Sequence, residues 1–400
     1  MKEGWEYKKL GDLALSMADG PFGSNLKKEH YTNRKEVRII QLSNIGEEGW
    51  RDENTKYTTY EHLDSIKRSE VLPGDVVIAK MMPAGRAILC PNKESKYVLS
   101  SDAVRVTLKK GLNSRFILFS INSPYFRKQV YDNVSGSGRV RTSLTKLRDC
   151  KVGLPPLSEQ QSIVDYLDSA FAKIDAMKAN AEKALNEAKA LFQASLKEML
   201  EPKEGWEEKK LKEVVASITD GDHQPPPKSD DGIPFITISN IDKNSNKIVF
   251  GETFFVPQSY YCALKKDRIP QQGDVLYTVT GSFGIPVLVD FQKEFCFQRH
   301  IALIRPNMGL LSSTYLFYWI LSSYATSQAE DTATGAAQRT VSLNSLRNFT
   351  INFPPLSEQQ SIVETLDSLK SKVDRLQANY DKISQECDAL KQAILRDIFE

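Results

Sequence analysis

The chain has 400 residues, of which 40% are hydrophobic and 26% charged, and its formal net charge is +2. This composition excludes disordered and fibrous proteins, and the length suits two or three globular domains. The longest apolar run, residues 315–321, is far shorter than the ~20 residues that cross a bilayer. Because the N-terminus also lacks a signal-peptide pattern, we expect a cytoplasmic protein with no membrane partner.

The net charge is divided unevenly along the chain. Residues 1–150 carry 26 lysines and arginines against 18 acidic residues, a net charge of +8, whereas residues 201–350 carry 15 against 17, a net charge of −2. A basic first segment suits a polyanionic partner such as a nucleic acid. The second segment would have to gather its basic residues locally to bind the same kind of partner.

Two short sequences recur about 200 residues apart. Gly-Trp-Glu occurs at residues 4–6 and again at 205–207, and Pro-Pro-Leu-Ser-Glu-Gln-Gln occurs at residues 155–161 and again at 354–360. The chain is therefore a duplicated unit. We divide it into four segments, namely residues 1–154, 155–201, 202–353 and 354–400.

The first and third segments have the pattern of an α+β fold. Glycine-marked turns separate short apolar runs, which are typical of strands, from one helical stretch in each segment. In chain order, we expect strands at 37–42 and 75–79, a helix at 114–131, strands at 235–238 and 274–277, and a helix at 313–328. The two segments share glycines and apolar positions more than polar residues, which predicts one fold with two different surfaces.

The second and fourth segments are each predicted to form one long helix. A Pro-Pro pair cannot lie inside a helix, and Ser158 or Ser357 then offers an N-cap, with Gln161 or Gln360 three residues later as in a capping box. Residues 155–169 match the second copy at 13 of 15 positions. We infer that the helices meet the same partner twice, while the globular segments meet two different ones.

Both helices carry a long apolar stripe. The stripe of the second helix alternates spacings of four and three residues, which is the coiled-coil period, and the first helix repeats the theme. We expect the two helices to pair as an antiparallel coiled coil that relates the repeats by a pseudo-twofold axis. The first stripe is Ile163, Leu167, Ala170, Ile174, Met177, Ala181, Ala184, Leu185, Ala188 and Leu191, and the second is Ile362, Leu366, Leu369, Val373, Leu376, Tyr380, Ile383, Cys387, Leu390 and Ile394.

The sequence offers no recognisable catalytic motif. It contains no phosphate-binding loop, dinucleotide-binding fingerprint, zinc-protease motif or nucleophile elbow. The five cysteines and four histidines have no metal-ligand spacing, so we expect no metal in this chain. Asp220 and His223 place an acid near an imidazole, but no nucleophile or third ligand accompanies them. We therefore expect a chain without catalytic residues.

These features, in this order and spacing, are similar to those of the specificity subunit of type I restriction-modification enzymes over essentially the whole chain. They include the Gly-Trp-Glu openings, the Pro-Pro-Leu-Ser-Glu-Gln-Gln helix starts, and the loops at residues 136–144 and 335–343. The resemblance implies two target recognition domains, each of which binds one half of a bipartite, asymmetric DNA site. It also implies that the helices act as a ruler between the half-sites.

The resemblance further implies partners and cofactors. Two methyltransferase subunits would dock on the helix starts, and restriction subunits would join them. The docking residues would be Ser158, Glu159, Gln160, Gln161, Ser357, Glu358, Gln359 and Gln360. S-adenosylmethionine, and ATP with magnesium, would bind to these partners and no cofactor to this chain. The chain would then be a non-catalytic subunit of a site-specific deoxyribonuclease and adenine methyltransferase complex.

Basic and polar residues of both recognition domains are candidates for contacts with double-stranded DNA. Lysine and arginine bind phosphates, and arginine also reads guanine in the major groove. The candidates of the first domain are Asn25, Lys27, Lys28, His30, Lys80, Arg86, Arg139 and Arg141, and those of the second are His223, Gln224, Thr280, Ser282, Arg299, His300, Gln338 and Arg339. Gln338 and Arg339 lie just before the helix start and favour phosphate contacts.

A second hypothesis belongs to another class of protein. The chain could be a coiled-coil scaffold that does not bind DNA and whose two globular ends bind protein or carbohydrate. Such ends would need exposed aromatic side chains, which the sequence alone does not identify. The net charge of +8 on residues 1–150 favours the DNA-binding hypothesis.

Overall fold

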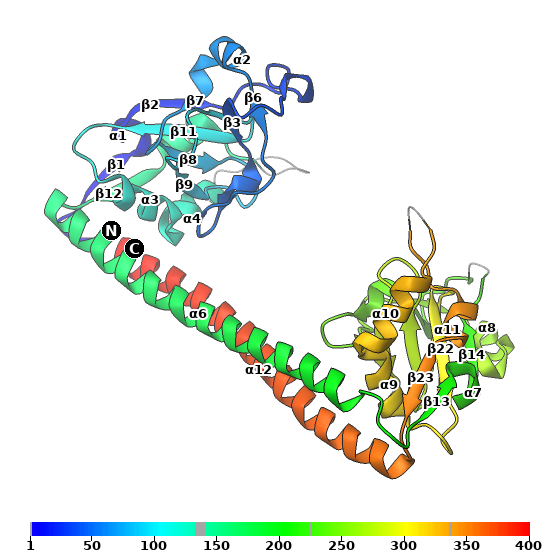
Figure 1. Cartoon of the computed structure of the whole chain (residues 1–400). Helices are drawn as coiled ribbons and strands as arrows, with labels where there is room; N and C mark the ends of the chain where they lie inside the picture. The colour runs from blue at the N-terminus through cyan, green and yellow to red at the C-terminus, as the bar shows by residue number, and fades with distance from the viewer. Residues whose placement is uncertain (1, 133–140, 224–225, 336–337) are drawn as a thin grey trace. The chain divides into compact units, whose positions relative to one another are not determined.

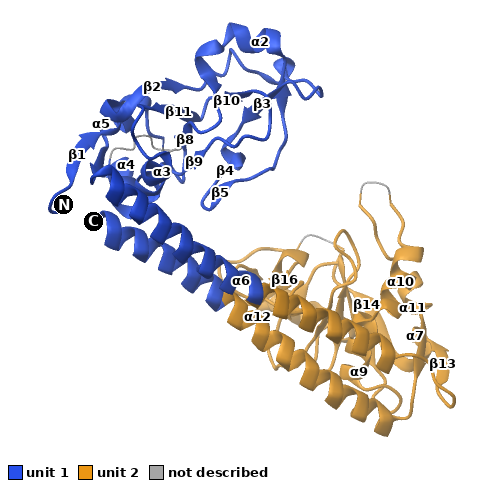
Figure 2. Cartoon of the chain, turned by 60° about the vertical axis from the view of Figure 1, so that its left-hand side comes forward, with its two compact units in different colours: residues 1–180, 382–400 blue, residues 181–381 orange. Residues whose placement is uncertain are grey.

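The computed structural model of the chain (Figure 1) describes residues 2–132, 141–223, 226–335 and 338–400. It divides into two compact units (Figure 2), in which unit 1 comprises residues 1–180 and 382–400 and unit 2 comprises residues 181–381. Each unit holds one globular segment and one end of each long helix. The predicted α+β fold is confirmed. No helix within the described ranges is long and apolar enough to cross a bilayer.

Unit 1 contains two four-stranded sheets, with the strand orders β2-β11-β8-β9 and β6-β3-β10-β7, and the strand pairs β1-β12 and β4-β5. Its helices and strands, in chain order, are β1 (Glu6–Lys9), α1 (Leu10–Leu13), β2 (Ala14–Asp19), β3 (Val37–Ile40), β4 (Ile45–Gly46), β5 (Gly49–Trp50), β6 (Tyr57–Thr58), α2 (Tyr60–Ser65), β7 (Glu70–Val71), β8 (Val76–Ala79), β9 (Ala87–Leu89), β10 (Tyr97–Leu99), β11 (Ala103–Leu108), α3 (Ser114–Asn122), α4 (Pro124–Asp132), α5 (Leu144–Asp149) and β12 (Lys151–Leu154).

Unit 2 repeats this plan, with the strand orders β14-β22-β19-β20 and β18-β15-β21 and the pairs β13-β23 and β16-β17. Its elements are β13 (Glu207–Lys210), α7 (Leu211–Val214), β14 (Val215–Asp220), β15 (Ile233–Ile236), β16 (Ile241–Asp242), β17 (Lys247–Ile248), β18 (Phe254–Val256), α8 (Gln258–Ala263), β19 (Val275–Thr278), β20 (Pro286–Leu288), β21 (Cys296–Phe297), β22 (Ile301–Pro306), α9 (Ser313–Leu321), α10 (Ser323–Thr332), α11 (Leu343–Arg347) and β23 (Thr350–Phe353). The sequence repeat is therefore also a structural repeat.

The predicted strands are present, but two of them end earlier than expected. The strand predicted at 37–42 ends at Ile40, because the side chain of Asn44 accepts a hydrogen bond from the backbone N–H of Gln41 at 2.8 Å and turns the chain. In unit 2, Asn240 accepts from the N–H of Thr237 at 2.9 Å in the same way. An asparagine that bonds the backbone three residues earlier favours a turn over a continued strand.

The predicted helices at 114–131 and 313–328 are each broken in two, which corrects our expectation. Ser123 separates α3 from α4, and Pro124 has no N–H to continue the helix. Ser322 separates α9 from α10 without a proline. Both serines are fully buried, and each hydroxyl donates to the carbonyl three residues earlier at 2.6 Å. The two breaks therefore share one buried serine contact.

The two long helices are α6 (Leu157–Met199) and α12 (Leu356–Phe399). In unit 1, the start of α6 packs with the end of α12, where Leu167 shares a core with Leu395. In unit 2, the end of α6 packs with the start of α12, and Lys189 donates to Gln377 at 2.7 Å. Both units thus show the antiparallel pairing that the sequence predicted.

Four positions of the predicted stripes are wrong. Ala184 is exposed, and Met177, Leu191 and Leu390 are 60%, 60% and 48% exposed. A straight helix drifts by about 20° per heptad from a 3.5-residue repeat, so the buried face moves to neighbours such as Phe192 and Leu395.

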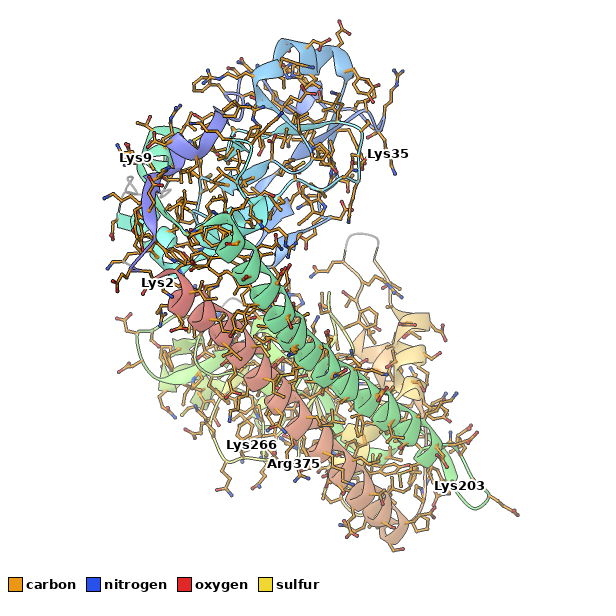
Figure 3. All side chains as sticks on the ribbon, turned by 90° about the vertical axis from the view of Figure 1, so that its left-hand side faces the viewer. Lys2, Lys9, Lys35, Lys203, Lys266 and Arg375 are labelled. Carbon is orange, nitrogen blue, oxygen red and sulfur yellow. The ribbon has the colours of Figure 1, made fainter. Side chains whose placement is uncertain are left out.

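Toward their ends, the helices pack on the globular cores as well as on each other. The ring of Phe399 in α12, for example, lies tilted against that of Phe116 with a centroid distance of 5.4 Å. Lys2 also lies beside the last turns of α12 (Figure 3).

The starts of α6 and α12 are held by a buried glutamine, and the predicted serine N-caps are wrong. The helices begin one residue before Ser158 and Ser357. The Nε2 atom of Gln359 donates to the carbonyl oxygens of Leu310 and Pro354 at 2.8 and 2.9 Å, and its Oε1 accepts from the N–H of Ser312 at 2.9 Å. One buried amide thus satisfies three backbone groups.

Gln160 likewise bonds backbone groups at the start of α6. Its Nε2 donates to the carbonyl of Pro155 at 2.9 Å, and its Oε1 accepts from the N–H of Asn113 at 3.4 Å. A second matched contact lies beside it. The indole N–H of Trp5 donates to Glu159 at 3.0 Å, and that of Trp206 donates to the matched glutamate of α12 at 3.2 Å. The Gly-Trp-Glu and Pro-Pro-Leu-Ser-Glu-Gln-Gln sequences therefore meet within each unit.

We expect Gln359→Ala to destabilise unit 2 strongly. The substitution leaves three backbone groups without their partner in a site that is 0% exposed, and unpaired buried groups cost about 1–3 kcal/mol each. Thermal unfolding of the full chain measures the effect. The control is Gln360→Ala, because that exposed side chain bonds only Glu364 at 3.1 Å. Equal melting temperatures for the two variants would contradict the assigned role of Gln359.

Candidate nucleic-acid interface

In unit 1, three strand ends meet at one edge of the β2-β11-β8-β9 sheet. Because β2 and β8 both run antiparallel to β11, the ends of β2 and β8 lie beside the start of β11. The residues just beyond these ends line a cavity of about 520 Å³. We call this surface the unit 1 edge, and it consists of Asp19–Gly23, Lys80–Met81, Ser101–Asp102 and Arg141–Leu144.

Two ion pairs fix the cations of the unit 1 edge. The Nζ atom of Lys80 lies 2.6 Å from Oδ1 of Asp19, and Arg141 pairs with Asp102. The backbone joins the same residues, because the N–H of Lys80 donates to the carbonyl of Asp102 at 2.8 Å. Lys80 is 12% exposed and Arg141 is half exposed. The carboxylates thus hold donor groups in place, where they can face the oxygen atoms of a ligand.

Unit 2 has a matching edge on its β14-β22-β19-β20 sheet. The N–H of Val279 donates to the carbonyl of His300 at 2.9 Å, and the N–H of Gly281 donates to the carbonyl of Arg339 at 2.9 Å. The first of these bonds corresponds to the Lys80 bond of unit 1. We call this surface the unit 2 edge, and it consists of Asp220–His223, Val279–Gly281, Arg299–His300 and Gln338–Thr340.

The unit 2 edge has different chemistry. His223 Nε2 lies 2.9 Å from Oδ2 of Asp220, and Arg268 contacts the other oxygen at 3.5 Å. Arg299 and Arg339 are exposed. Burial, with the charge of Arg299, lowers the pKa of His300, so this ring is neutral at pH 7. A neutral imidazole offers one donor and one acceptor, which makes the edge suited to hydrogen-bond readout.

A close backbone approach shapes both edges. A Cβ atom on Gly20 would lie 1.7 Å from the carbonyl oxygen of Ser100, and one on Gly221 would lie 2.0 Å from that of Phe297. Only glycine permits this contact. The glycines of the Asp-Gly pairs at 19–20 and 220–221 therefore let the chain pass close to the neighbouring backbone, and the two residues that follow each pair lie on the edge.

Four predicted DNA contacts lie on the loop after the unit 1 edge. Lys27 and Lys28 are exposed, and the Nζ atom of Lys27 lies 3.6 Å from Oε1 of Glu29. His30 stacks on His62 with a centroid distance of 4.1 Å, and its Nδ1 accepts from the N–H of Lys27 at 3.0 Å. The carbonyl of Asn25 also bonds His62 at 2.8 Å. His30 therefore orders this loop.

Other predicted contacts are not brought to the edges in an accessible form. Arg86 donates to the carbonyl of Pro83 at 3.2 Å and lies near Glu47, and it is not part of the cavity lining of the unit 1 edge. Thr280 belongs to the unit 2 edge but is 6% exposed, and Ser282 lies in the adjoining turn, where its carbonyl accepts a bond. Arg139 and Gln224 lie outside the described residues. Among the members of the unit 1 edge that were not candidates are the two carboxylates Asp19 and Asp102, and the aromatic ring of Phe22.

The predicted docking residues divide into buried and exposed groups. Gln160 and Gln359 are 4% and 0% exposed, so their side chains are committed to the helix starts. Glu159 and Glu358 bond the two tryptophans, and Gln161 accepts from the side chain of Asn113 at 2.8 Å. Ser158 and Ser357 remain exposed on the outer surface of the helix starts, and Gln360 is exposed as well. Contact of any of them with another subunit stays a prediction.

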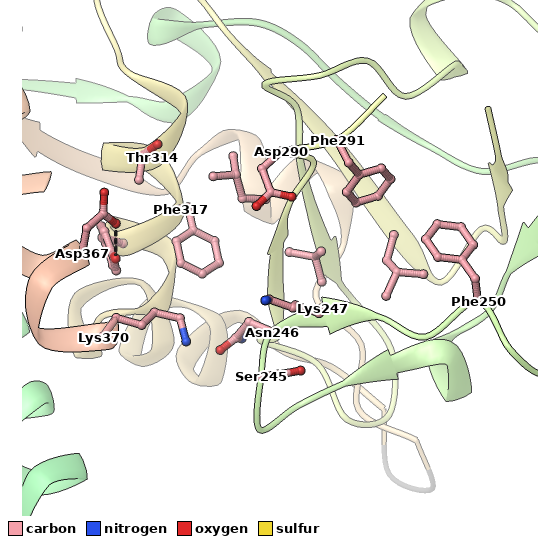
Figure 4. A pocket seen from close by; sticks show the side chains of 14 residues that line it. Ser245, Asn246, Lys247, Phe250, Asp290, Phe291, Thr314, Phe317, Asp367 and Lys370 are labelled. Atoms are coloured by element: carbon pink, nitrogen blue, oxygen red, sulfur yellow. Dashed lines mark hydrogen bonds between the residues drawn. The ribbon is translucent and has the colours of Figure 1, made fainter. Parts of the chain in front are cut away.

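A second pair of cavities also occupies matching places in the two units. The cavity of unit 2, about 300 Å³, lies between the β16-β17 hairpin, α9 and α12, with Phe250, Phe291 and Phe317 in its lining (Figure 4). The hydroxyl of Tyr318 donates to Asp367 there at 2.6 Å. The matching cavity of unit 1, about 510 Å³, has a different lining that includes Trp50, Phe119 and Phe171. The cavities repeat in place and differ in chemistry, like the edges.

Within the described part of the chain, no group of three or more histidine, cysteine, aspartate or glutamate side chains is arranged to hold a metal ion. The acid and imidazole noted in the sequence, Asp220 and His223, do form a contact. Their other described neighbours are Arg268, Asp222 and Tyr260. This cluster suits hydrogen bonding to a ligand.

Known proteins resemble this chain in sequence and in fold. Its sequence is 22% identical to the EcoBI type I restriction enzyme specificity subunit of Escherichia coli, over 96% of this chain and 84% of the relative. It is 23% identical to the EcoKI specificity subunit of Escherichia coli K12, over 100% and 89%. A chain from a type I R-M system structure matches with a TM-score of 0.72 at 20% identity, over 98% and 97%. The HsdS subunit from Thermoanaerobacter tengcongensis matches with a TM-score of 0.53 at 20% identity, over 99% and 96%.

The family model described as "Type I restriction modification DNA specificity domain" matches residues 2–187 and again residues 203–385. The two matches follow the structural repeat and cover most of the chain. They confirm the resemblance found in the sequence, including the prediction of a specificity subunit in place of an enzyme. The chain therefore belongs to the type I restriction modification DNA specificity family.

Proposed function

We propose that this chain selects the DNA sequence on which a type I restriction-modification complex acts. Each unit binds one half of a bipartite, asymmetric site. The observation that carries the proposal is the pair of sheet edges, which match in position and backbone bonding but differ in side chains, with Lys80 and Arg141 in one and His223 and His300 in the other. Two copies of one scaffold with different donors suit two unlike half-sites.

The distribution of charge supports DNA as the ligand. In unit 1, Lys28 adds exposed positive charge on the loop that follows the unit 1 edge, whereas Lys27, Lys80 and Arg141 lie in ion pairs. In unit 2, Arg299 and Arg339 lie on the edge although residues 201–350 carry a net charge of −2. Local cations bind phosphates whatever the net charge of the domain. The scaffold hypothesis does not account for this gathering of donors on both edges.

The long helices serve as the ruler in this proposal. A 43-residue helix such as α6 is about 65 Å long. Two DNA-binding domains on one face of a duplex bind half-sites separated by about one helical turn, roughly 34 Å, or a multiple of it. Because each globular segment is bonded to the start of its own helix, the helix pair fixes the spacing between the half-sites.

The helices also provide two equivalent docking places for methyltransferase subunits. Leu191 and Leu390 occupy matching positions of the repeat and are both largely exposed. Leu157 and Leu356 form a second matched and exposed pair at the helix starts, next to Ser158 and its counterpart. Large apolar side chains that repeat on the surface favour a partner that binds twice.

The remaining subunits complete the complex in this proposal. Two methyltransferase subunits supply S-adenosylmethionine and transfer the methyl group to adenine, and restriction subunits use ATP with magnesium. The present chain contributes binding and positioning. This division of labour agrees with the names of its relatives, which are type I restriction enzyme specificity subunits.

Exchange of residues 1–154 for the corresponding segment of another family member tests the division into two readers. The expected complex recognises a site in which one half has changed and the other half and the spacer are the same. Mapping of methylated adenines in cells that express the hybrid with its methyltransferase gives the result. The control is the reciprocal exchange of residues 202–353. A change in both halves after either exchange would disprove independent readout.

Leu191→Glu tests the docking proposal. A charge in an apolar contact prevents binding at that place, so the complex should keep one methyltransferase subunit where the wild type keeps two. Adding Leu390→Glu should remove the second. Native mass spectrometry counts the subunits, and Asn186→Glu, at an exposed position on another side of α6, serves as the control. Two bound subunits in the double variant would refute this surface.

A further inference from the structure

Phe22 is the most exposed large hydrophobic side chain of the described residues, at 83%. It lies on the unit 1 edge, two residues after Gly20, and forms part of the cavity lining beside Lys80 and Arg141. Water contact with so much apolar surface is unfavourable. The same cavity lining holds the Lys80–Asp19 and Arg141–Asp102 ion pairs, so the ring lies among charged groups on the proposed binding surface.

The backbone that carries Phe22 is held firmly. The N–H of Gly20 donates to the carbonyl of Ala103 at 3.0 Å, and the N–H of Asn25 donates to the carbonyl of Phe22 at 2.7 Å, which closes a turn. Pro21 between them is buried. The ring is thus exposed because a fixed turn presents it, in the way that rigid contact residues are presented at binding sites.

The matching position of unit 2 also carries an exposed ring. His223 lies two residues after Gly221, the glycine that makes the same close backbone approach as Gly20. Asp220 holds its Nε2 at 2.9 Å, and the second ring nitrogen gives the side chain a further polar atom. The two readers therefore present a planar ring at one place, apolar in unit 1 and polar in unit 2.

A nucleobase is the ligand that fits this arrangement. The phosphate of its nucleotide brings negative charge toward Lys80 and Arg141, and the base offers apolar area to the ring. A phenyl group has no hydrogen-bonding atom, so it reads a duplex either by contact with the methyl group of thymine or by insertion between base pairs. An imidazole can read the donor and acceptor groups of a base edge.

We propose that Phe22 makes an apolar contact with one base of the half-site bound by unit 1, and that His223 makes a polar contact at the corresponding place of the other half-site. This proposal rests on the function proposed above. The position of Phe22 and His223 would then be one at which the two units differ in base specificity.

The test compares Phe22→Ala with the wild-type chain, each in complex with its methyltransferase subunits. The duplex is the sequence that the wild-type complex selects from a random pool. We expect about tenfold weaker binding by Phe22→Ala, the usual cost of one lost base contact, and near wild-type binding by Phe22→Trp. Leu15→Ala is the control, because Leu15 is 72% exposed in the same unit and should bind normally. Melting temperatures should be unchanged.

Two modified duplexes distinguish the kinds of contact. Replacing each thymine of the half-site by uracil removes only its methyl group, and the wild type should lose affinity at one position where Phe22→Ala loses none. If the ring inserts between base pairs, 2-aminopurine at the adjacent position should instead gain fluorescence with the wild type only. His223→Ala should relax selectivity at one base pair of the other half-site.

Unchanged affinity and base selectivity of Phe22→Ala would overturn the proposal while leaving the function intact. Loss of methyltransferase subunits from Phe22→Ala without DNA would also overturn it, because the ring would then serve a protein contact. Failure of the wild-type complex to select any sequence would refute the proposed function itself.

Discussion

The buried amide at the start of each long helix is the contact on which the arrangement of each unit depends. Gln359 joins the helix start, the turn before α9 and the end of β23 through three hydrogen bonds, and Gln160 bonds two of the corresponding backbone groups in unit 1. Rotation of a helix relative to its globular segment would break these bonds around a buried glutamine side chain. A globular segment that cannot rotate relative to its helix is held in position by that helix.

This contact changes the meaning of the sequence repeat. The near-identity of residues 155–169 with their second copy suggested a shared partner, yet Gln160 and Glu159 serve contacts within the unit. These contacts within the unit give a structural reason for the match at both positions. Further candidates for a shared partner are the exposed matched residues, which include the pairs Leu191 with Leu390 and Leu157 with Leu356. Identity between repeats thus reflects internal bonding as well as docking.

Local pattern predicted what depends on local chemistry, namely the main strands, the long helices and the duplication. It failed where distant segments decide the outcome. The breaks at Ser123 and Ser322 depend on burial of a hydroxyl, and the exposure of Leu390 depends on helix drift over several heptads. The sequence predicted the basic residues of the unit 1 edge but not the carboxylates that pair with them. Basic residues such as Arg141 were found by their charge, but the partner Asp102 is 39 positions earlier, and only the antiparallel sheet brings them together.

The central claim is that two unlike edges read two separated half-sites. The most direct measurement is a footprint of the wild-type complex with its methyltransferase subunits on the selected duplex, with every base pair of the site then varied singly. The account predicts two short stretches of sequence dependence of different sequence, separated by a spacer of fixed length whose bases can be changed freely. A single continuous stretch, two identical half-sites, or binding that ignores sequence would contradict it.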